Sequence, residues 1–524
     1  MLLVTGSSAL RRHFDVVVIG RSLGCLTAAA LLARRDFRVL VLGHGEPPAS
    51  YGWQDRRLAR RLFSLPFGET PVWRRVLVDL AQSQTFRRCT RRIEPSFSLL
   101  AGPHRLQIPR ERAAFASEVR REFPEVQPVV DELWSTLALA DRALEAALSR
   151  DVPFAPVGFF ERLRARRWLG ALPFASESLR GLLDKLPGGH IYREAAFLPA
   201  LFLGDWGCPE GELPLLGAAR LQHDFVRHGL HFEAGADGFE DFLVQRIRAH
   251  GGRCELGERA DGFTFRRGRV SGVIMGGGEE TIGADHVLTG LDGRALVELS
   301  EGKGLSPSYA RWPELKPTLG RFVVSCWVRS AGLPEPLGLE AMVLPGPDLR
   351  GVPRPPLHIQ RLPDESDPSL AQLVTEVLVP LGQVRRGSEL RGVVLQCLRE
   401  QFPFIDRHLL LSDSPHDGLP LTVHENGQTR EIERVHLRGG SPRPEPMQPL
   451  WRAEPAGLLG LAGEPIVGPV RGTLLVGKTV FPGLGQEGEL IAAWSAASRV
   501  TRKDRAWQRR RRQMWTKIDT DPSV

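Results

Sequence analysis

The 524-residue sequence contains no run of about 18 or more uncharged apolar residues, which excludes a membrane-spanning helix. Its six cysteines are scattered without a C-x-x-C pair, a distribution typical of buried, reduced thiols in a large cytoplasmic protein. A secretory signal peptide is not expected, because the apolar start of the chain precedes Arg11 and Arg12 instead of following a charged segment. Lysine occurs only six times against 63 arginines, which we attribute to coding bias. We therefore predict a cytoplasmic protein.

Basic charge is concentrated at one end of the chain. Of the net charge of +8, residues 499–512 carry +7, from seven arginines, one lysine and one aspartate, so the remainder is almost neutral. A neutral body argues against a nucleic-acid partner. The tail from Ala506 to Trp515 combines four arginines with Trp507, Met514 and Trp515, a pattern that predicts peripheral contact with an anionic membrane; a solvated terminus is the alternative.

The sequence predicts an α/β fold with a Rossmann-like dinucleotide-binding domain. Phe14–Ile19 is a β-branched run typical of a buried parallel strand, residues 27–35 have helical composition, and Arg38–Leu42 forms a second strand. Such a βαβ unit is the smallest piece that makes a parallel pair. Residues 113–123 and 128–149 are expected to form amphipathic helices. Similar α/β character returns at 235–293, with a strand expected at 269–275, and at 472–500, with a helix expected at 487–500. We predict a discontinuous dinucleotide-binding domain (residues 1–50, 215–300 and 455–500), an α+β substrate domain (51–214 and 301–454) and a basic tail (501–524).

The segment Gly20–Cys25 lies between the first strand and its helix. A G-x-G-x-x-G fingerprint at this place would bring dinucleotide phosphates to the helix N-terminus. Only the first glycine of that pattern is present, because Ser22 and Cys25 take the other two places. Both are small enough for helix packing, but Ser22 adds a Cβ where a phosphate comes closest. The second strand is followed by Gly43 instead of an acidic residue that would bind ribose, and Glu46 comes three residues later. Taken alone, this pattern supports two interpretations equally: a nucleotide-binding site, and a doubly wound sheet that binds no nucleotide.

Further motifs cover most of the chain. Gly235–Leu243 begins a predicted helix, which Gly251 and Gly252 end, and Ala284–Leu288 is a later strand. Leu475–Gly488 leads from a strand through a glycine-rich turn into a helix. This order resembles the phytoene desaturase, carotenoid isomerase and retinol saturase branch of the flavin amine-oxidase superfamily. The resemblance implies that backbone N–H groups of the turn face a flavin, and that FAD contacts Gly20, Ser22, Gly24, Cys25, Gly43, Gly477, Lys478, Gly483, Gly485, Gln486, Glu487 and Gly488.

The chain departs from this family at the implied cofactor contacts. Lys478 stands where the family has an acidic residue, and Ser22, Cys25 and Gly43 depart at the dinucleotide end. Two interpretations follow. Lys478 pairs with the pyrophosphate, or no flavin binds, as in the Rab GDP-dissociation inhibitors, which resemble this fold and carry lipid without FAD. If the site has only drifted, Ser22→Gly with Gly43→Glu should raise flavin affinity, each contact contributing about 1 kcal/mol.

The resemblance implies an FAD-dependent oxidoreductase (a desaturase, saturase or isomerase) that acts on a polyene or isoprenoid lipid such as a carotenoid precursor. A flavin-free lipid-binding or scaffold protein on the same fold is the alternative. In such enzymes the flavin carries the chemistry, and no side chain here is a candidate catalytic base. His190, His223, His228 and His231 lie close together in the sequence but match no metal-ligand spacing, so no metal site is expected.

Overall fold

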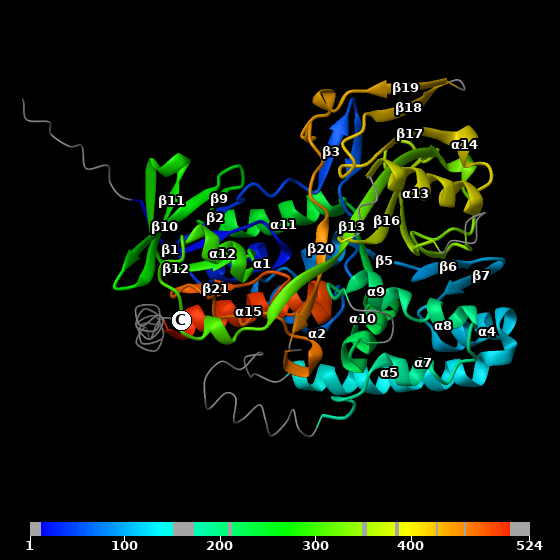
Figure 1. The fold of residues 1–524 in the computed structure, drawn as a ribbon, viewed down its shortest axis with the longest axis horizontal. Helices are drawn as coiled ribbons and strands as arrows, with labels where there is room; N and C mark the ends of the chain where they lie inside the picture. Colours follow the sequence, from blue (N-terminus) through cyan, green and yellow to red (C-terminus); the bar gives the residue numbers. More distant parts are fainter. Residues whose placement is uncertain are drawn as a thin grey trace, which may run out of the picture.

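The protein is built around two large β-sheets. The computed structural model describes residues 12–149, 172–207, 212–347, 354–382, 387–425, 428–454 and 457–503. Within them, a seven-stranded sheet lies on the left of Figure 1 and a ten-stranded sheet at the upper right, with a helical layer at the lower right. No helix in these ranges has the length and hydropathy that a bilayer span requires.

The seven-stranded sheet has a parallel centre. It consists of β1 (His13–Ile19), β2 (Val39–Leu42), β9 (Arg253–Glu255), β10 (Ala260–Arg266), β11 (Arg269–Met275), β12 (Glu280–Thr289) and β21 (Thr473–Leu475). Strands β9, β2, β1, β12 and β21 are parallel neighbours in this order. Helix α1 (Leu23–Arg34) packs against α11 (Gly235–Ala249) and α15 (Gly485–Lys503). The predicted βαβ unit is therefore present, and its helix begins at Leu23 because the Ser22 side chain caps it.

The order of these strands creates a crevice. β1 lies between β2 on one side and β12 on the other, so the connections leave the sheet centre in opposite directions. In doubly wound sheets, ligands bind outside the carboxyl ends of the strands at such a point. The carboxyl end of β1 leads into Gly20, and the carboxyl end of β21 leads into Val476.

The ten-stranded sheet covers the crevice from the other side. Its strands are β6 (Phe97–Ala101), β7 (His104–Ile108), β13 (Glu314–Arg329), β14 (Glu340–Leu344), β15 (Leu357–Pro363), β16 (Leu370–Pro380), β17 (Leu409–Asp413), β18 (Leu421–Glu425), β19 (Gln428–Ile432) and β20 (Gln448–Glu454). Successive side chains of a strand point to opposite faces. Along β13, Phe322, Val324 and Cys326 belong to a core shared with α13 (Gly387–Gln401). Arg321 therefore points to the opposite face, toward the seven-stranded sheet.

The helical layer consists of α4 (Arg112–Glu122), α5 (Gln127–Leu148), α7 (Leu179–Leu183), α8 (Ile191–Ala195), α9 (Leu198–Leu203) and α10 (Leu215–His228). Helix α10 packs against α5 and α9, and α15 packs against the turn that precedes it. The helices predicted at 113–123 and 128–149 are confirmed within one residue at each end.

Candidate functional site: a cleft between the two sheets

The loop after β1 is shaped by Gly20 and Ser22. Gly20 has a φ of +113°, which glycine tolerates and other residues rarely adopt. The Ser22 hydroxyl accepts a hydrogen bond from the backbone N–H of Cys25 at 3.4 Å, so Ser22 is the N-cap of α1. The Cys25 thiol is buried and donates to the carbonyl of Ile19 at 3.5 Å, and burial raises the pKa of this thiol. Both departures from the glycine fingerprint thus have local structural roles.

Several predicted cofactor glycines are required by the protein's own backbone. A Cβ on Gly24 would lie 1.8 Å from the carbonyl oxygen of Val476, and a Cβ on Gly477 would lie 2.3 Å from that of Gly290. These contacts let α1, β21 and the segment after β12 meet closely. A Cβ on Gly43 would lie 1.9 Å from the carbonyl oxygen of Leu256. The end of β2 therefore has no room for the acidic side chain that the fingerprint would place there.

The glycine-rich turn before α15 is also closed by protein. The N–H groups of Gly483, Leu484 and Gly485 donate to the carbonyls of Leu461, Phe481 and Pro482. A Cβ on Gly485 would lie 2.1 Å from the carbonyl oxygen of Leu203, and one on Gly488 would lie 2.3 Å from that of Phe481. The expectation that this turn offers free N–H groups to a flavin is therefore wrong for residues 483–485, because the carbonyls of Leu461 and of the turn itself accept their hydrogen bonds.

A cleft of about 1040 Å³, including its open mouth, lies between the two sheets. The seven-stranded domain contributes the first turn of α1, part of α11, Lys478, Gln486 and Glu489, whereas the ten-stranded sheet contributes Arg321, His358 and Glu376. Its polar lining residues are Arg21, Ser22, Arg61, Ser64, Asp205, Glu240, Arg321, His358, Glu376, Gln448, Lys478, Gln486 and Glu489. Its apolar wall contains Leu23, Leu26, Phe63, Leu65, Phe67, Phe202, Phe239 and Leu243. Mixed walls of this kind are typical of cofactor and substrate sites.

Two backbone N–H groups, in the loop after β1 and in the first turn of α1, already bind carboxylates. The N–H of Arg21 donates to Glu46 Oε2 at 3.2 Å, and the N–H of Gly24, in the first turn of α1, donates to Glu489 Oε2 at 3.1 Å. Glu489 is buried, with 2% of its surface exposed. Burial raises the pKa of both carboxyl groups, while these hydrogen bonds and the charge of Lys478 act against it.

Lys478 follows β21 and lies among acidic groups. Its Nζ is 3.7 Å from Asp205 Oδ1, and 26% of its side chain is exposed. Gln486, at the start of α15, places its Oε1 in a buried position with no hydrogen-bond partner among the described residues. Of the predicted cofactor contacts, the cleft walls contain Ser22, Lys478 and Gln486. Ser22 contributes a hydroxyl and Lys478 a cation, and the amide oxygen of Gln486 is the one of the three groups that has no hydrogen-bond or ion-pair partner among the described residues.

The other predicted contacts lie elsewhere. Glu487 points away from the cleft and binds Arg220 through both oxygens, at 2.7 and 2.8 Å. The remaining predicted contacts pack behind the residues that line the cleft and do not line it themselves. They are Gly20, Gly24, Cys25, Gly43, Gly477, Gly483, Gly485 and Gly488. Sequence reasoning missed Glu489, which is an acidic residue directly before the buried apolar run Leu490–Ala493 of α15. The position of an acidic residue at the edge of a buried apolar run was the sequence signal that could have identified Glu489.

The opposite wall carries paired charges. Arg321 Nη1 lies 2.5 Å from Glu376 Oε1, and the guanidinium also donates to the carbonyls of Phe202 and Gly204 at 2.7 and 2.6 Å. His358 Nε2 lies 2.9 Å from Glu340 Oε2. Because these polar groups are buried and hydrogen-bonded to one another, they form a rigid polar wall.

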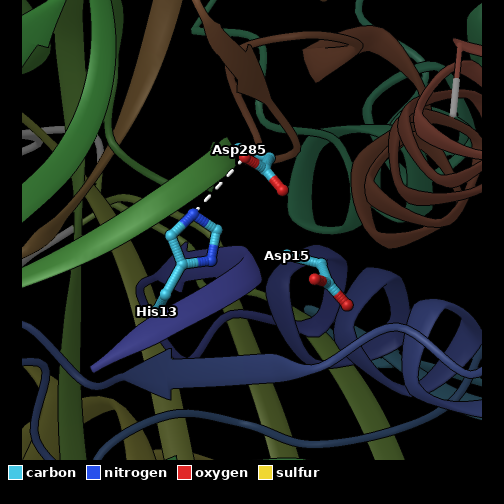
Figure 2. A group of neighbouring side chains, drawn as sticks. All are labelled: His13, Asp15 and Asp285. Atoms are coloured by element: carbon cyan, nitrogen blue, oxygen red, sulfur yellow. Dashed lines mark ion pairs between the residues drawn. The ribbon is translucent and has the colours of Figure 1, made fainter. Parts of the chain in front are cut away.

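A separate group of possible metal ligands lies at the amino end of β1, far from the cleft. His13 Nε2 is 3.4 Å from Asp285 Oδ1. Figure 2 marks this ion pair with a dashed line and shows Asp15 beside it. The Asp15 carboxylate is held by Arg38, with Oδ1 2.7 Å from Nη2. His13 and Asp285 are exposed. We interpret the group as surface ion pairs.

Two of the clustered histidines have acidic partners, and the other two are neutral. His223 Nδ1 lies 2.9 Å from Asp141 Oδ2, and His190 Nε2 lies 2.8 Å from Glu125 Oε1. Burial lowers the pKa of His228 and of His231 to about 4, so both are neutral at physiological pH.

Comparison with known proteins defines the fold. No family model and no curated protein matches this chain. Among solved structures, an oxidoreductase from Methanosarcina mazei aligns over 92% of this chain and 99% of its own, with 17% identity and a TM-score of 0.56. Cyclohexylamine oxidase from Brevibacterium oxydans IH-35A aligns over 94% and 99%, with 15% identity and a TM-score of 0.54. A putrescine oxidase with redesigned cofactor binding aligns over 94% and 100%, with 12% identity and a TM-score of 0.57.

These likenesses extend over nearly the whole chain at low identity, so they establish the fold. The predicted fold class, a Rossmann-like domain combined with an α+β substrate domain, is confirmed. The narrower resemblance to the phytoene desaturase branch stays a prediction.

Proposed function

We propose that this protein is an FAD-dependent oxidoreductase and that FAD and substrate meet in the cleft between the two sheets. The observation that carries the proposal is the position of the cleft, at the carboxyl ends of β1 and β21, where the strand order changes direction. The fold is shared with structures named as oxidases, which supports the same reaction class.

The residues present fit a dinucleotide on one condition. The N–H groups of Arg21 and Gly24 hold carboxylate oxygens at 3.2 and 3.1 Å, which shows that both can bind anion oxygens. The Lys478 cation stands beside them, and the Gln486 Oε1 is available to an N–H donor. A pyrophosphate can use these donors once Glu46 and Glu489 have moved away.

Within this proposal, bound FAD supplies the acceptance or donation of electrons. The protein's own residues bind and orient the reactants. Phe63, Phe67 and Phe239 form the apolar wall, and Phe63 and Phe67 each lie within 6.5 Å of Phe239 between ring centroids. Such a wall excludes water and accommodates an apolar ligand, which supports a polyene or isoprenoid lipid as the substrate class.

A second function is favoured by the same two carboxylates. Because Glu46 and Glu489 already use the N–H groups that a pyrophosphate would need, the chain is also suited to hold an apolar ligand without flavin. The absorption spectrum of the purified full-length protein distinguishes the two functions. A flavin spectrum supports the oxidoreductase, whereas a colourless protein that takes up no FAD at high micromolar concentration supports the flavin-free function.

Lys478→Met is expected to weaken FAD binding by roughly tenfold, because it removes a cation that lines the cleft and acts on both carboxylates bound to the Arg21 and Gly24 N–H groups. Fluorescence titration with FAD measures the change. Lys303→Met is the matched control, since Lys303 is exposed and pairs with Glu301 on the surface. Equal FAD affinity in both variants would show that Lys478 does not contact the phosphates.

We also propose peripheral binding to anionic membranes through the basic tail. Residues 504–524 lie outside the described residues, but α15 leads into them, and Arg499 of α15 lines a recess with Arg267, Arg269, His286 and Arg471. The recess adds basic charge beside the start of the tail. Each basic residue near an anionic surface contributes up to about 1 kcal/mol.

A chain ending at Val500 is therefore expected to lose at least about tenfold in binding to phosphatidylglycerol vesicles relative to the full chain. Co-sedimentation measures this, and pelleting of the full chain should fall as salt rises, because salt screens the attraction. Replacing the four arginines at 509–512 by lysine keeps the charge and should preserve pelleting. Equal pelleting of the full and shortened chains would identify the tail as a solvated terminus.

A further inference from the structure

The two carboxylates at the amino end of α1 come from distant parts of the chain. Glu46 lies in the segment after β2, and Glu489 lies in the first turns of α15. Both nevertheless accept hydrogen bonds from backbone N–H groups of the same short segment, those of Arg21 and Gly24. A Cβ on Gly20 would lie 3.1 Å from Glu46 Oε1, and one on Gly24 would lie 3.3 Å from the Glu489 Cβ. The carboxylates are therefore packed directly against the loop that a dinucleotide would have to contact.

An N–H group has one hydrogen to donate, so a phosphate oxygen and a carboxylate oxygen compete for it. The positive end of the helix dipole favours either anion at this place. Both cannot be bound together easily, because like charges in a partly buried site repel each other strongly. Lys478 is the nearby cation that both carboxylates share, and Asp205 already pairs with it. An incoming pyrophosphate thus meets two N–H donors that are already in use, whereas Arg61, which also lines the cleft, adds a further positive charge near Glu46.

We propose that Glu46 and Glu489 act as internal anions that occupy the pyrophosphate subsite and hold the affinity for FAD low until they are displaced. This inference rests on the proposed function, because it concerns the same cleft. It assigns to Glu489 a role that the cofactor motif does not contain. It also explains why α1 keeps an anion-binding N-terminus although Ser22 and Lys478 depart from the cofactor motif. Burial raises the pKa of both carboxyl groups, which makes displacement with proton uptake easier.

The test removes the carboxylates one at a time from the full-length protein. Glu489→Ala frees the Gly24 N–H and is expected to tighten FAD binding at least about tenfold, and Glu46→Ala with Glu489→Ala at least about 100-fold. Glu489→Gln keeps the side-chain volume and removes the charge, so it should give an intermediate gain even if the alanine variant folds poorly. Glu298→Ala, at a surface ion pair, is the control and should leave FAD affinity unchanged.

Three probes separate this inference from the proposed function. FAD is titrated by fluorescence, riboflavin is titrated in the same way as a flavin without phosphate, and sodium pyrophosphate is tested by its effect on the thermal unfolding temperature. We expect the variants to gain affinity for FAD and not for riboflavin, and pyrophosphate to raise the unfolding temperature of the double variant more than that of the wild type.

Each outcome has a defined meaning. If wild type and folded variants bind FAD equally, the inference that Glu46 and Glu489 occupy the pyrophosphate subsite is wrong, and the proposed oxidoreductase function stands. If no protein binds FAD but the double variant responds to pyrophosphate, the occupied subsite stands and the flavin function falls. If no protein binds FAD and pyrophosphate does not distinguish the variants from the wild type, both proposals fall.

Discussion

Replacing Arg220 by methionine is expected to lower the free energy of unfolding by about 3–5 kcal/mol, because it leaves buried carboxylates without their cation. Only 1% of the Arg220 side chain is exposed, and it lies on α10 between α5 and α15. It donates to Glu487 through Nε and Nη2 at 2.7 and 2.8 Å and to Asp141 through Nη1 at 2.8 Å. Asp224 Oδ2 lies 3.3 Å from its Nε.

Urea unfolding followed by tryptophan fluorescence measures the effect. The matched control is Arg294→Met, because Arg294 pairs with Glu298 on the surface, with 86% and 67% of the side chains exposed. That variant should lose less than about 1 kcal/mol. Adding Asp224→Asn to Arg220→Met should recover part of the loss, since it removes one of the uncompensated charges. Equal stability of the Arg220 and Arg294 variants would contradict a structural role for the buried network.

The destabilisation by Arg220→Met should also shrink as the pH falls. In the wild type, burial opposes ionisation of Asp141, but hydrogen bonding by His223 and the charge of Arg220 hold its pKa below the ordinary value. A depressed carboxyl pKa contributes stability that is lost as the pH falls through the folded pKa. Without Arg220, the folded state takes up protons more readily than the unfolded state, so the variant gains relative stability in acid. Unfolding midpoints at neutral and acidic pH check this.

The sequence was sufficient for the fold class and for several individual elements, because the relevant signals are local. The β-branched run at 14–19 became β1, and the strand expected at 269–275 became β11 with the same bounds. Hydrophobic periodicity and glycine positions act over about one element, which is the range that a single sequence shows directly. The helix expected at 487–500 was also found, extended to Gly485–Lys503.

The site could be predicted only in part, because its decisive contacts join distant residues. Lys478 and Gln486 do line the cleft, as their place after β21 and before α15 suggested. No local motif, however, could show that Leu203 covers Gly485 or that Glu489 reaches Gly24. Glycines are ambiguous in the same way. A glycine that admits a phosphate and a glycine that admits a neighbouring carbonyl look identical in the sequence.

Ser22 illustrates how a departure from a motif can be misread. In the sequence it seemed to obstruct a phosphate, whereas in the structure it is the N-cap of α1. Its replacement by glycine would cost only a few tenths of a kcal/mol of helix stability. It would leave the Arg21 and Gly24 donors still bound to Glu46 and Glu489. The obstacle to a phosphate therefore lies in the two carboxylates, and Ser22→Gly alone should leave FAD affinity nearly unchanged.

Gly43→Ala is expected to destabilise the protein by roughly 1–3 kcal/mol or more, although it adds only one methyl group. The new Cβ would meet the carbonyl oxygen of Leu256 at 1.9 Å and its carbonyl carbon at 2.8 Å. These are backbone atoms beside β2 and β9, which are paired in parallel through Leu42 and Glu255. Because no flexible side chain can move aside, the strands themselves must separate.

Gly257→Ala provides the control, since a Cβ on Gly257 meets nothing within 4 Å. Its effect should stay within about 0.5 kcal/mol. Gly43→Glu, which would restore the acidic residue of the dinucleotide fingerprint, meets the same obstruction and adds a charge. We therefore expect it to lower the urea midpoint at least as much as Gly43→Ala and to bring no gain in FAD affinity, in contrast to what the sequence predicts. A stable Gly43→Glu protein with tighter FAD binding would mean that β2 and the Leu256 segment separate readily, and that the ribose subsite is open in solution.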